Sequence, residues 1–194
     1  MNFLSIDTST DICSVSLFYN SEMRTLKKSG VKEHSKYLPV FTKELINGIE
    51  NEIKYIALSI GPGSFSGLKI GSSFCKGLAN ALDIPILPID TFDGMKEKIS
   101  DTNMYYIAIY SHRNFAFSCL YNNKTKKADY KCSDMYKLDK HKIYGYGFPD
   151  DITLNYIEIK PCSERIGMLS LDRFELLKKI GIDNINPIYL LVKK

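Results

Sequence analysis

The stretch that most constrains the fold of this chain is residues 59–71, with the sequence SIGPGSFSGLKIG. It joins the apolar residues 55–60, which have the composition of a buried strand, to a helix-like run that ends near Leu82. Glycines flank Pro62 on both sides, so the backbone can turn sharply between the two elements. Ser64 follows the turn, and its hydroxyl oxygen is expected to cap the helix by accepting a bond from a free backbone N–H. The stretch therefore predicts a strand, a tight turn and a helix in succession.

Three glycines in this stretch, Gly63, Gly67 and Gly71, recur every four residues and share one face of the predicted helix. Because a glycine inside a helix costs about 1 kcal/mol relative to alanine, such a face indicates that another backbone comes close to it. One interpretation is a phosphate-binding loop, but that motif ends in Gly-Lys-Ser/Thr, whereas here Leu68 and Lys69 follow Gly67. The other interpretation is close packing, inside the chain or against a partner, and the spacing favours it.

The composition is that of an ordinary water-soluble domain, with 44% hydrophobic and 25% charged residues among 194. No apolar run approaches 20 residues and no signal peptide is evident, so we expect a cytoplasmic protein without a membrane span. The net charge of +4 permits contact with nucleic acid without requiring it. The five scattered cysteines form no C-x-x-C pair, which is typical of free thiols in a reducing compartment. The three histidines have no metal-ligand spacing, and no metal site is predicted.

The order of elements predicts a mixed α/β chain in two parts. Up to about residue 100, the hydrophobic pattern gives β-β-β-α-β-α-β-α, opening with an antiparallel meander. A second strand hairpin over 104–121 restarts the pattern, which divides the chain into a first lobe, 1–102, and a second lobe, 103–194. Within the second lobe a helix is expected over 163–180, with Asp172 in position to cap its last part.

One candidate site lies at the first turn of the meander, formed by Asp7, Thr8, Ser9 and Thr10. Backbone N–H groups and hydroxyls in such a turn can hold phosphate, and an aspartate can position a magnesium-bound water. The alternative is a hairpin turn built from residues that favour turns. His34 is a further candidate for a general base, although its place just before a helix favours a local hydrogen bond. No Ser/His/Asp or Cys/His set is apparent.

A second candidate surface is the lysine-rich segment 122–142, in which Tyr130 and Tyr136 are interspersed. Lysines could contact an RNA backbone while the tyrosines stack on bases, in which case the affinity would fall steeply with salt. The alternative is a solvated, mobile face. The sequence leaves both open.

Four segments of the chain resemble the TsaB (YeaZ) family: residues 4–10 (LSIDTST), 33–35 (EHS), 60–71 (IGPGSFSGLKIG) and 187–190 (PIYL). The similarity is dense in the first half and sparse afterwards. It implies an actin-like, Hsp70-like (ASKHA) fold of two related α/β lobes, with a short second lobe. It also implies a role in forming N6-threonylcarbamoyladenosine at position 37 of tRNAs that read ANN codons.

The resemblance further implies that this chain is a non-catalytic partner of TsaD, the related subunit that carries the transfer chemistry. The ATPase TsaE would join the pair, tRNA would be contacted indirectly through the complex, and the chain would form a homodimer when alone. TsaD carries a metal-binding His-x-x-x-His pair where this chain has Thr91 and Met95, so neither a metal nor another cofactor is expected. In addition, Ser111 stands where the family usually has aspartate.

The glycine face then becomes the expected docking surface for TsaD. Its predicted residues are Gly63, Phe65, Gly67, Leu68, Gly71 and Phe74. The turn with Asp7, Thr8, Ser9 and Thr10 would be a vestigial phosphate site. The alternative function is an autonomous ATP- or sugar-phosphate-binding enzyme of the same fold that uses this turn.

Overall fold

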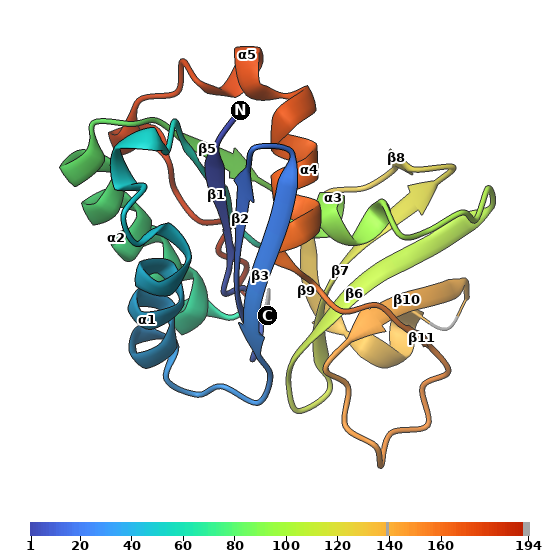
Figure 1. Cartoon of the computed structure of the whole chain (residues 1–194). Coiled ribbons are helices and arrows are strands. Elements are labelled where there is room, and N and C mark those ends of the chain that lie inside the picture. Colours follow the sequence, from blue (N-terminus) through green and yellow to red (C-terminus); the bar gives the residue numbers. More distant parts are fainter. Residues whose placement is uncertain (139, 192–194) are drawn as a thin grey trace.

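The computed structural model describes residues 1–138 and 140–191. It contains two β-sheets, each the centre of one lobe, joined into a mixed α/β architecture as predicted (Figure 1). None of the helices in the described ranges is long and apolar enough to cross a membrane.

The first sheet has five strands in the order β3-β2-β1-β4-β5. The strands β1, β2 and β3 form the predicted antiparallel meander, while β4 and β5 run parallel to β1. The central strand β1 is buried along its whole length, because helices cover both faces of the sheet. The bounds are β1 Phe3–Asp7, β2 Cys13–Tyr19, β3 Glu22–Lys28, β4 Ile56–Ser59 and β5 Ile86–Ile89.

Two long helices, α1 (His34–Ile46) and α2 (Phe65–Leu82), cover one face of the first sheet (Figure 1). The side chain of Ser64 accepts a hydrogen bond from the backbone N–H of Gly67 at 3.3 Å, which confirms the predicted cap of α2. The helix α4 (Ser163–Asp172) covers the opposite face. The short helix α5 (Phe174–Leu177) follows α4.

The second sheet has the strand order β11-β10-β6-β7-β8, and β9 also pairs with β7. The predicted hairpin corresponds to β6 and β7, which are antiparallel. The helix α3 (Thr91–Lys96) packs between this sheet and α4. The bounds are β6 Met104–His112, β7 Phe115–Asn122, β8 Thr125–Lys126, β9 Lys131–Asp134, β10 Lys142–Tyr146 and β11 Ile157–Glu158.

The C-terminal part of the chain differs from the predicted division into lobes. The second sheet begins at Met104, close to the predicted boundary, but α4 returns to the first sheet. Ser163 at the start of α4 bonds Ser14 and Ser16 of β2 through its hydroxyl, at 2.6 and 2.7 Å. The strands of the first sheet carry apolar side chains on both faces, and α4 buries the face that α1 and α2 leave open. The chain from 163 onward therefore belongs to the first lobe in space.

The helix boundary near Asp172 also differs from the prediction. Asp172 is the last residue of α4, and α5 begins only after Arg173, without a side-chain cap. The predicted cap by Asp172 is wrong, because Arg173 and not Asp172 is the residue that directly precedes α5.

Candidate functional site

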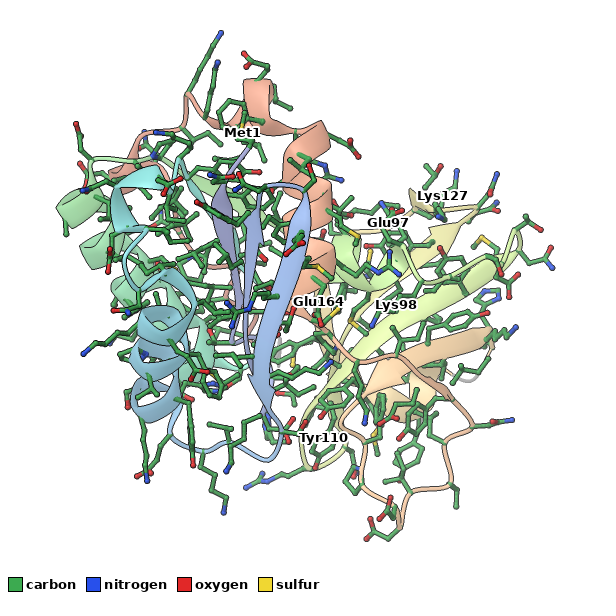
Figure 2. The ribbon with its side chains drawn as sticks, viewed as in Figure 1. Met1, Glu97, Lys98, Tyr110, Lys127 and Glu164 are labelled. Atoms are coloured by element: carbon green, nitrogen blue, oxygen red, sulfur yellow. The ribbon has the colours of Figure 1, made fainter. Side chains whose placement is uncertain are left out.

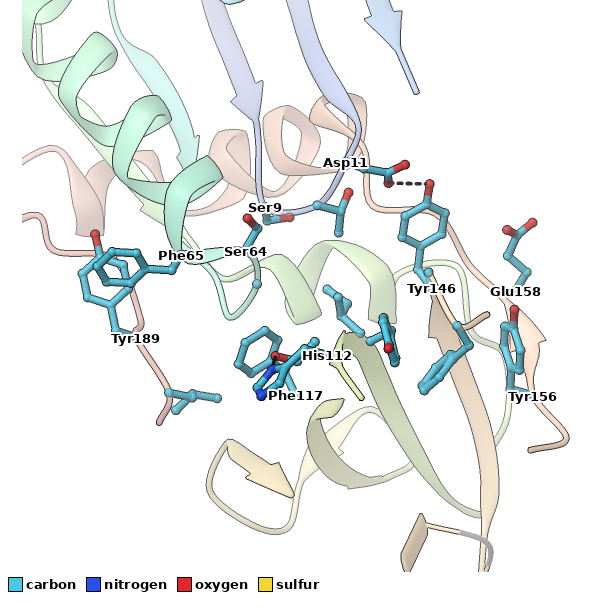
Figure 3. A pocket seen from close by; sticks show the side chains of 18 of the residues that line it. Ser9, Asp11, Ser64, Phe65, His112, Phe117, Tyr146, Tyr156, Glu158 and Tyr189 are labelled. Carbon is cyan, nitrogen blue, oxygen red and sulfur yellow. Dashed lines mark hydrogen bonds between the residues drawn. The ribbon is translucent and has the colours of Figure 1, made fainter. Parts of the chain in front are cut away.

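A cleft of about 670 Å³ lies between the two lobes (Figure 3). The first lobe contributes the β1–β2 turn and the start of α2, and the second lobe contributes the ends of β6 and β10. The C-terminal segment closes one side with Tyr189, Leu190 and Leu191. The cleft therefore brings together five segments that are far apart in the sequence.

The side chains along the cleft are mostly aromatic, hydroxylic or acidic. Three carboxylates, those of Asp11, Asp150 and Glu158, line it, and the described lining residues include no lysine or arginine. The hydroxyl of Tyr146 donates a hydrogen bond to Asp11 at 2.9 Å, visible in Figure 3. Because like charges repel, this lining disfavours a phosphate group unless a cation accompanies it.

The turn predicted as a phosphate site is divided between the core and the cleft. Asp7 is buried, and its Oδ1 accepts hydrogen bonds from the backbone N–H and the hydroxyl of Ser9, at 2.9 and 2.7 Å. The other carboxylate oxygen, Oδ2, has no partner among the described residues, and burial raises the pKa of Asp7. Thr8, Ser9 and Thr10 are also buried, but Ser9 and Thr10 border the wall of the cleft. The aspartate and the cleft are thus not one site.

The glycine face packs against this same turn of its own chain. A Cβ atom on Gly63 would lie 2.2 Å from the carbonyl oxygen of Ser9, and one on Gly67 would lie 2.1 Å from that of Thr8. On Gly71 it would meet the hydroxyl of Thr8 at 2.3 Å. That hydroxyl donates a hydrogen bond to the carbonyl of Gly67 at 2.8 Å. Close packing is therefore the role of the face, and it occurs inside the chain.

The predicted docking surface must be corrected accordingly. Gly63, Gly67 and Gly71 are buried against the turn, and Leu68 is only 1% exposed, so these residues present nothing to a partner. Phe74 is half-buried against the core of the first lobe. Phe65 differs, because 61% of it is exposed.

The exposed Phe65 lies against Tyr189, with ring centroids 4.6 Å apart (Figure 3). Tyr189 is itself 42% exposed, and we call Phe65 and Tyr189 the aromatic pair. The backbone N–H of Ile188 donates to the carbonyl of Ile60 at 2.7 Å, which places the C-terminal segment beside the turn before α2. Sequence reasoning missed Tyr189; the Pro-Ile-Tyr-Leu run at 187–190 was visible, but nothing in it indicates where the segment docks.

His34 is a structural residue rather than a cleft residue. It is 4% exposed, and burial lowers the pKa of its imidazole, so the ring is neutral near pH 7. Its Nε2 lies near Gly67, on the inner side of α2. His112, by contrast, lies at the cleft, where its Nδ1 is 3.0 Å from the hydroxyl of Ser111.

The two residues that replace the histidine pair expected of TsaD are part of the packing. The hydroxyl of Thr91 lies 2.8 Å from that of Ser59, at the end of β4. Met95 is 1% exposed and belongs to the core beneath the second sheet. In residues 1–138 and 140–191, no three His, Cys, Asp or Glu side chains are grouped so that they could hold a metal ion.

The chain is similar to proteins of tRNA modification. A family model described as TsaD: tRNA N6-adenosine threonylcarbamoyltransferase matches residues 20–130. The tRNA threonylcarbamoyladenosine biosynthesis protein TsaB of Haemophilus influenzae is 35% identical over 101 residues, 50% of this chain and 42% of that protein. TsaB of Escherichia coli is 29% identical over 100 residues, 50% of this chain and 43% of that protein. The matched part thus spans less than half the length of these relatives.

The solved structures that resemble this chain share its whole fold. YeaZ from Pseudomonas aeruginosa superposes with a TM-score of 0.78 at 18% identity, covering 97% of this chain and 99% of that one. A second structure, of an uncharacterized protein from the same organism with similarity to peptidase YEAZ, gives 0.79 at 18% identity, with 98% and 99% covered. The fold is thus the predicted actin-like (ASKHA) fold of two α/β lobes.

Proposed function

Because this chain belongs to the TsaB (YeaZ) family, we propose that it is a non-catalytic scaffold and activating subunit of the complex that forms N6-threonylcarbamoyladenosine at position 37 of tRNAs. Its partner in this role is the catalytic subunit TsaD, and the pair presents a joint surface to TsaE. The substrates are tRNAs that read ANN codons, held by the complex as a whole.

The observation that carries this proposal is the lining of the interlobe cleft. Three carboxylates face it without an opposing lysine or arginine among the described lining residues. Enzymes that transfer phosphoryl groups depend on cationic side chains or metal ions to stabilise the charge of the phosphates. A cleft with this lining supports a role in assembly over one in nucleotide chemistry.

The contact with TsaD is assigned to the aromatic pair. Phe65 is the first residue of α2, and its ring is exposed, whereas the glycines and Leu68 of the predicted docking face are buried and Phe74 is half-buried. Tyr189 supports it from the C-terminal segment, and Leu191 beside it is 83% exposed. Aromatic side chains held on a surface are frequent energetic centres of protein interfaces. The pair is therefore the anchor that we assign to the interface with TsaD.

Co-expression with tagged TsaD tests this assignment. Phe65→Glu places a charge in the interface, and loss of a central contact worth about 2 kcal/mol weakens pairing about 30-fold. Leu176→Glu is the matched control, because Leu176 is 74% exposed on α5, away from the cleft (Figure 1). Equal recovery of the Phe65→Glu and Leu176→Glu chains with TsaD would rule out the aromatic pair as the anchor.

The same surface is expected to support self-pairing when TsaD is absent. Sedimentation of the isolated chain should then show a concentration-dependent dimer, and Phe65→Glu should shift it to monomer. A wild-type chain that sediments as a monomer at every concentration would exclude the homodimer.

A further inference from the structure

The excess positive charge of this chain is concentrated in one segment. Residues 122–142 contain seven lysines and three aspartates, an excess of four. The whole chain has the same excess, with 26 lysines and arginines against 22 aspartates and glutamates. The remainder of the protein is therefore balanced, and the second lobe carries the net charge.

The topology of the second sheet gathers most of these lysines at one end. Tyr105 at the start of β6 pairs with Tyr121 at the end of β7. On the neighbouring strands, Lys142 of β10 pairs with Tyr105, and Lys126 of β8 pairs with Tyr121. These four residues form one row across the strands, about 15 Å from Lys142 to Lys126 at the usual strand spacing. Lys124 and Lys127 flank Lys126 in sequence. We call Lys124, Lys126, Lys127 and Lys142 the lysine end.

The lysine end lies opposite the interlobe cleft. The strands β6 and β10 both start at the lysine end and finish at the cleft, which their last residues line. Figure 2 shows the two ends, with Lys127 at the outer edge of the second lobe and Tyr110 at the cleft. The second lobe thus presents the lysine end on one side and the carboxylates Asp150 and Glu158 at the cleft.

The lysines at this end are available to an anion. All four are exposed. Lys124 pairs with Glu97 at 3.6 Å and Lys142 with Asp101 at 3.1 Å, whereas Lys126 and Lys127 make no ion pair within the described part of the chain. Exposed ion pairs contribute at most about 1 kcal/mol, so a polyanion can displace the two paired carboxylates.

We propose that the lysine end binds the phosphate backbone of RNA, and specifically that of tRNA. The choice of tRNA rests on the proposed function. The more general inference, that the ligand has a polyphosphate backbone, rests on the charge of the lysines alone. An anionic membrane is the less suitable ligand, because surface-bound proteins also insert apolar side chains. Among the described residues, the exposed large hydrophobic side chains lie elsewhere, with none in the β7–β8 turn.

The contact is with the backbone and not with the bases. Tyr130, which the sequence suggested as a stacking residue, turns inward and donates a hydrogen bond to Asp90. The ammonium group of Lys126 covers its ring at 3.7 Å from the centroid. Stacking by Tyr130 is therefore wrong, and recognition at this end is independent of base sequence.

The test is a titration of unmodified tRNA with the isolated full chain at salt concentrations from 50 to 300 mM, roughly the range in which counterion release is measured. The variant K126E/K127E should bind about 10-fold more weakly or worse, and its plot of log affinity against log salt should be shallower by about 2. The control K54E/K179E also replaces two lysines with glutamates, at exposed sites of the first lobe, and should bind tRNA as tightly as the wild type. A neutral pair, K126Q/K127Q, excludes a folding defect if its circular dichroism is unchanged.

Three results would overturn the proposal: no wild-type complex at 50 mM salt, equal losses in the two charge-reversal variants, or tighter binding to phosphatidylserine vesicles than to tRNA. Recovery of K126E/K127E with TsaD is measured in parallel. A chain that binds tRNA but does not pair with TsaD would refute the proposed function and leave this inference standing.

Discussion

Replacing Gly67 with alanine should destabilise the protein through one backbone contact. The new Cβ would lie 2.1 Å from the carbonyl oxygen of Thr8, more than 1 Å inside normal van der Waals contact, and 3.3 Å from Nε2 of His34. Overpacking of this kind costs about 1–3 kcal/mol, and the upper part of that range applies because the obstructing atom is backbone.

Two further effects decide the net change for Gly67→Ala. Moving the turn away breaks the buried hydrogen bond from Thr8 to the carbonyl of Gly67, a loss of about 1 kcal/mol. Alanine gains about 1 kcal/mol over glycine in helix propensity, which offsets that loss. The free energy of unfolding should therefore fall by about 2–3 kcal/mol, and Tm by about 5–10 °C.

Gly77 on the same helix provides the matched control. A Cβ there has nothing within 4 Å, so Gly77→Ala should stabilise the chain by up to about 1 kcal/mol. Urea unfolding followed by circular dichroism measures both variants against the wild type. If Gly67→Ala proves as stable as Gly77→Ala, the close packing of the glycine face against the turn is not what the structure describes.

Two other changes have defined outcomes. Asp7→Asn should stabilise the chain at pH 7. Burial raises the pKa of Asp7, so the contribution of the Asp7 carboxyl to stability is full at low pH and is lost as the pH rises through its folded-state pKa. The neutral amide of asparagine does not lose it. The free energy of unfolding should rise by about 1 kcal/mol or more at pH 7, and this gain should vanish toward pH 4. A gain that does not change with pH would contradict the burial of an ionised Asp7. Calorimetry with ATP and magnesium should show no binding tighter than about 1 mM, because the described lining residues of the cleft offer the phosphates no lysine or arginine, and no three described His, Cys, Asp or Glu side chains are grouped to hold the magnesium. Micromolar affinity would instead support the alternative nucleotide-binding enzyme.

Local patterns were sufficient to predict the helices and strands of the first half of the chain. The meander, the strand before the glycine stretch and the cap at Ser64 all depend on residues within a few positions of one another. Hydrophobic period and turn chemistry determine such elements directly. The spacing of the glycines also predicted correctly that another backbone lies close.

The sequence does not predict which segment packs against a given surface, because such packing depends on contacts between distant parts of the chain. The glycine spacing is compatible with the turn at Thr8 and with a partner chain, and only the three-dimensional arrangement distinguishes them. The same holds for Tyr189, which reaches Phe65 from the far end of the chain, and for α4, whose helical pattern does not reveal which sheet it covers. The lysine end likewise arises from strand pairing and not from the order of the lysines.

The most direct test of the central proposal is the recovery of this chain with TsaD from cells that express both. The wild type and Leu176→Glu should co-purify with TsaD, whereas Phe65→Glu should be lost at equal expression, because it removes the more exposed member of the aromatic pair. Failure of the wild-type chain to co-purify with TsaD would contradict its role as a partner subunit.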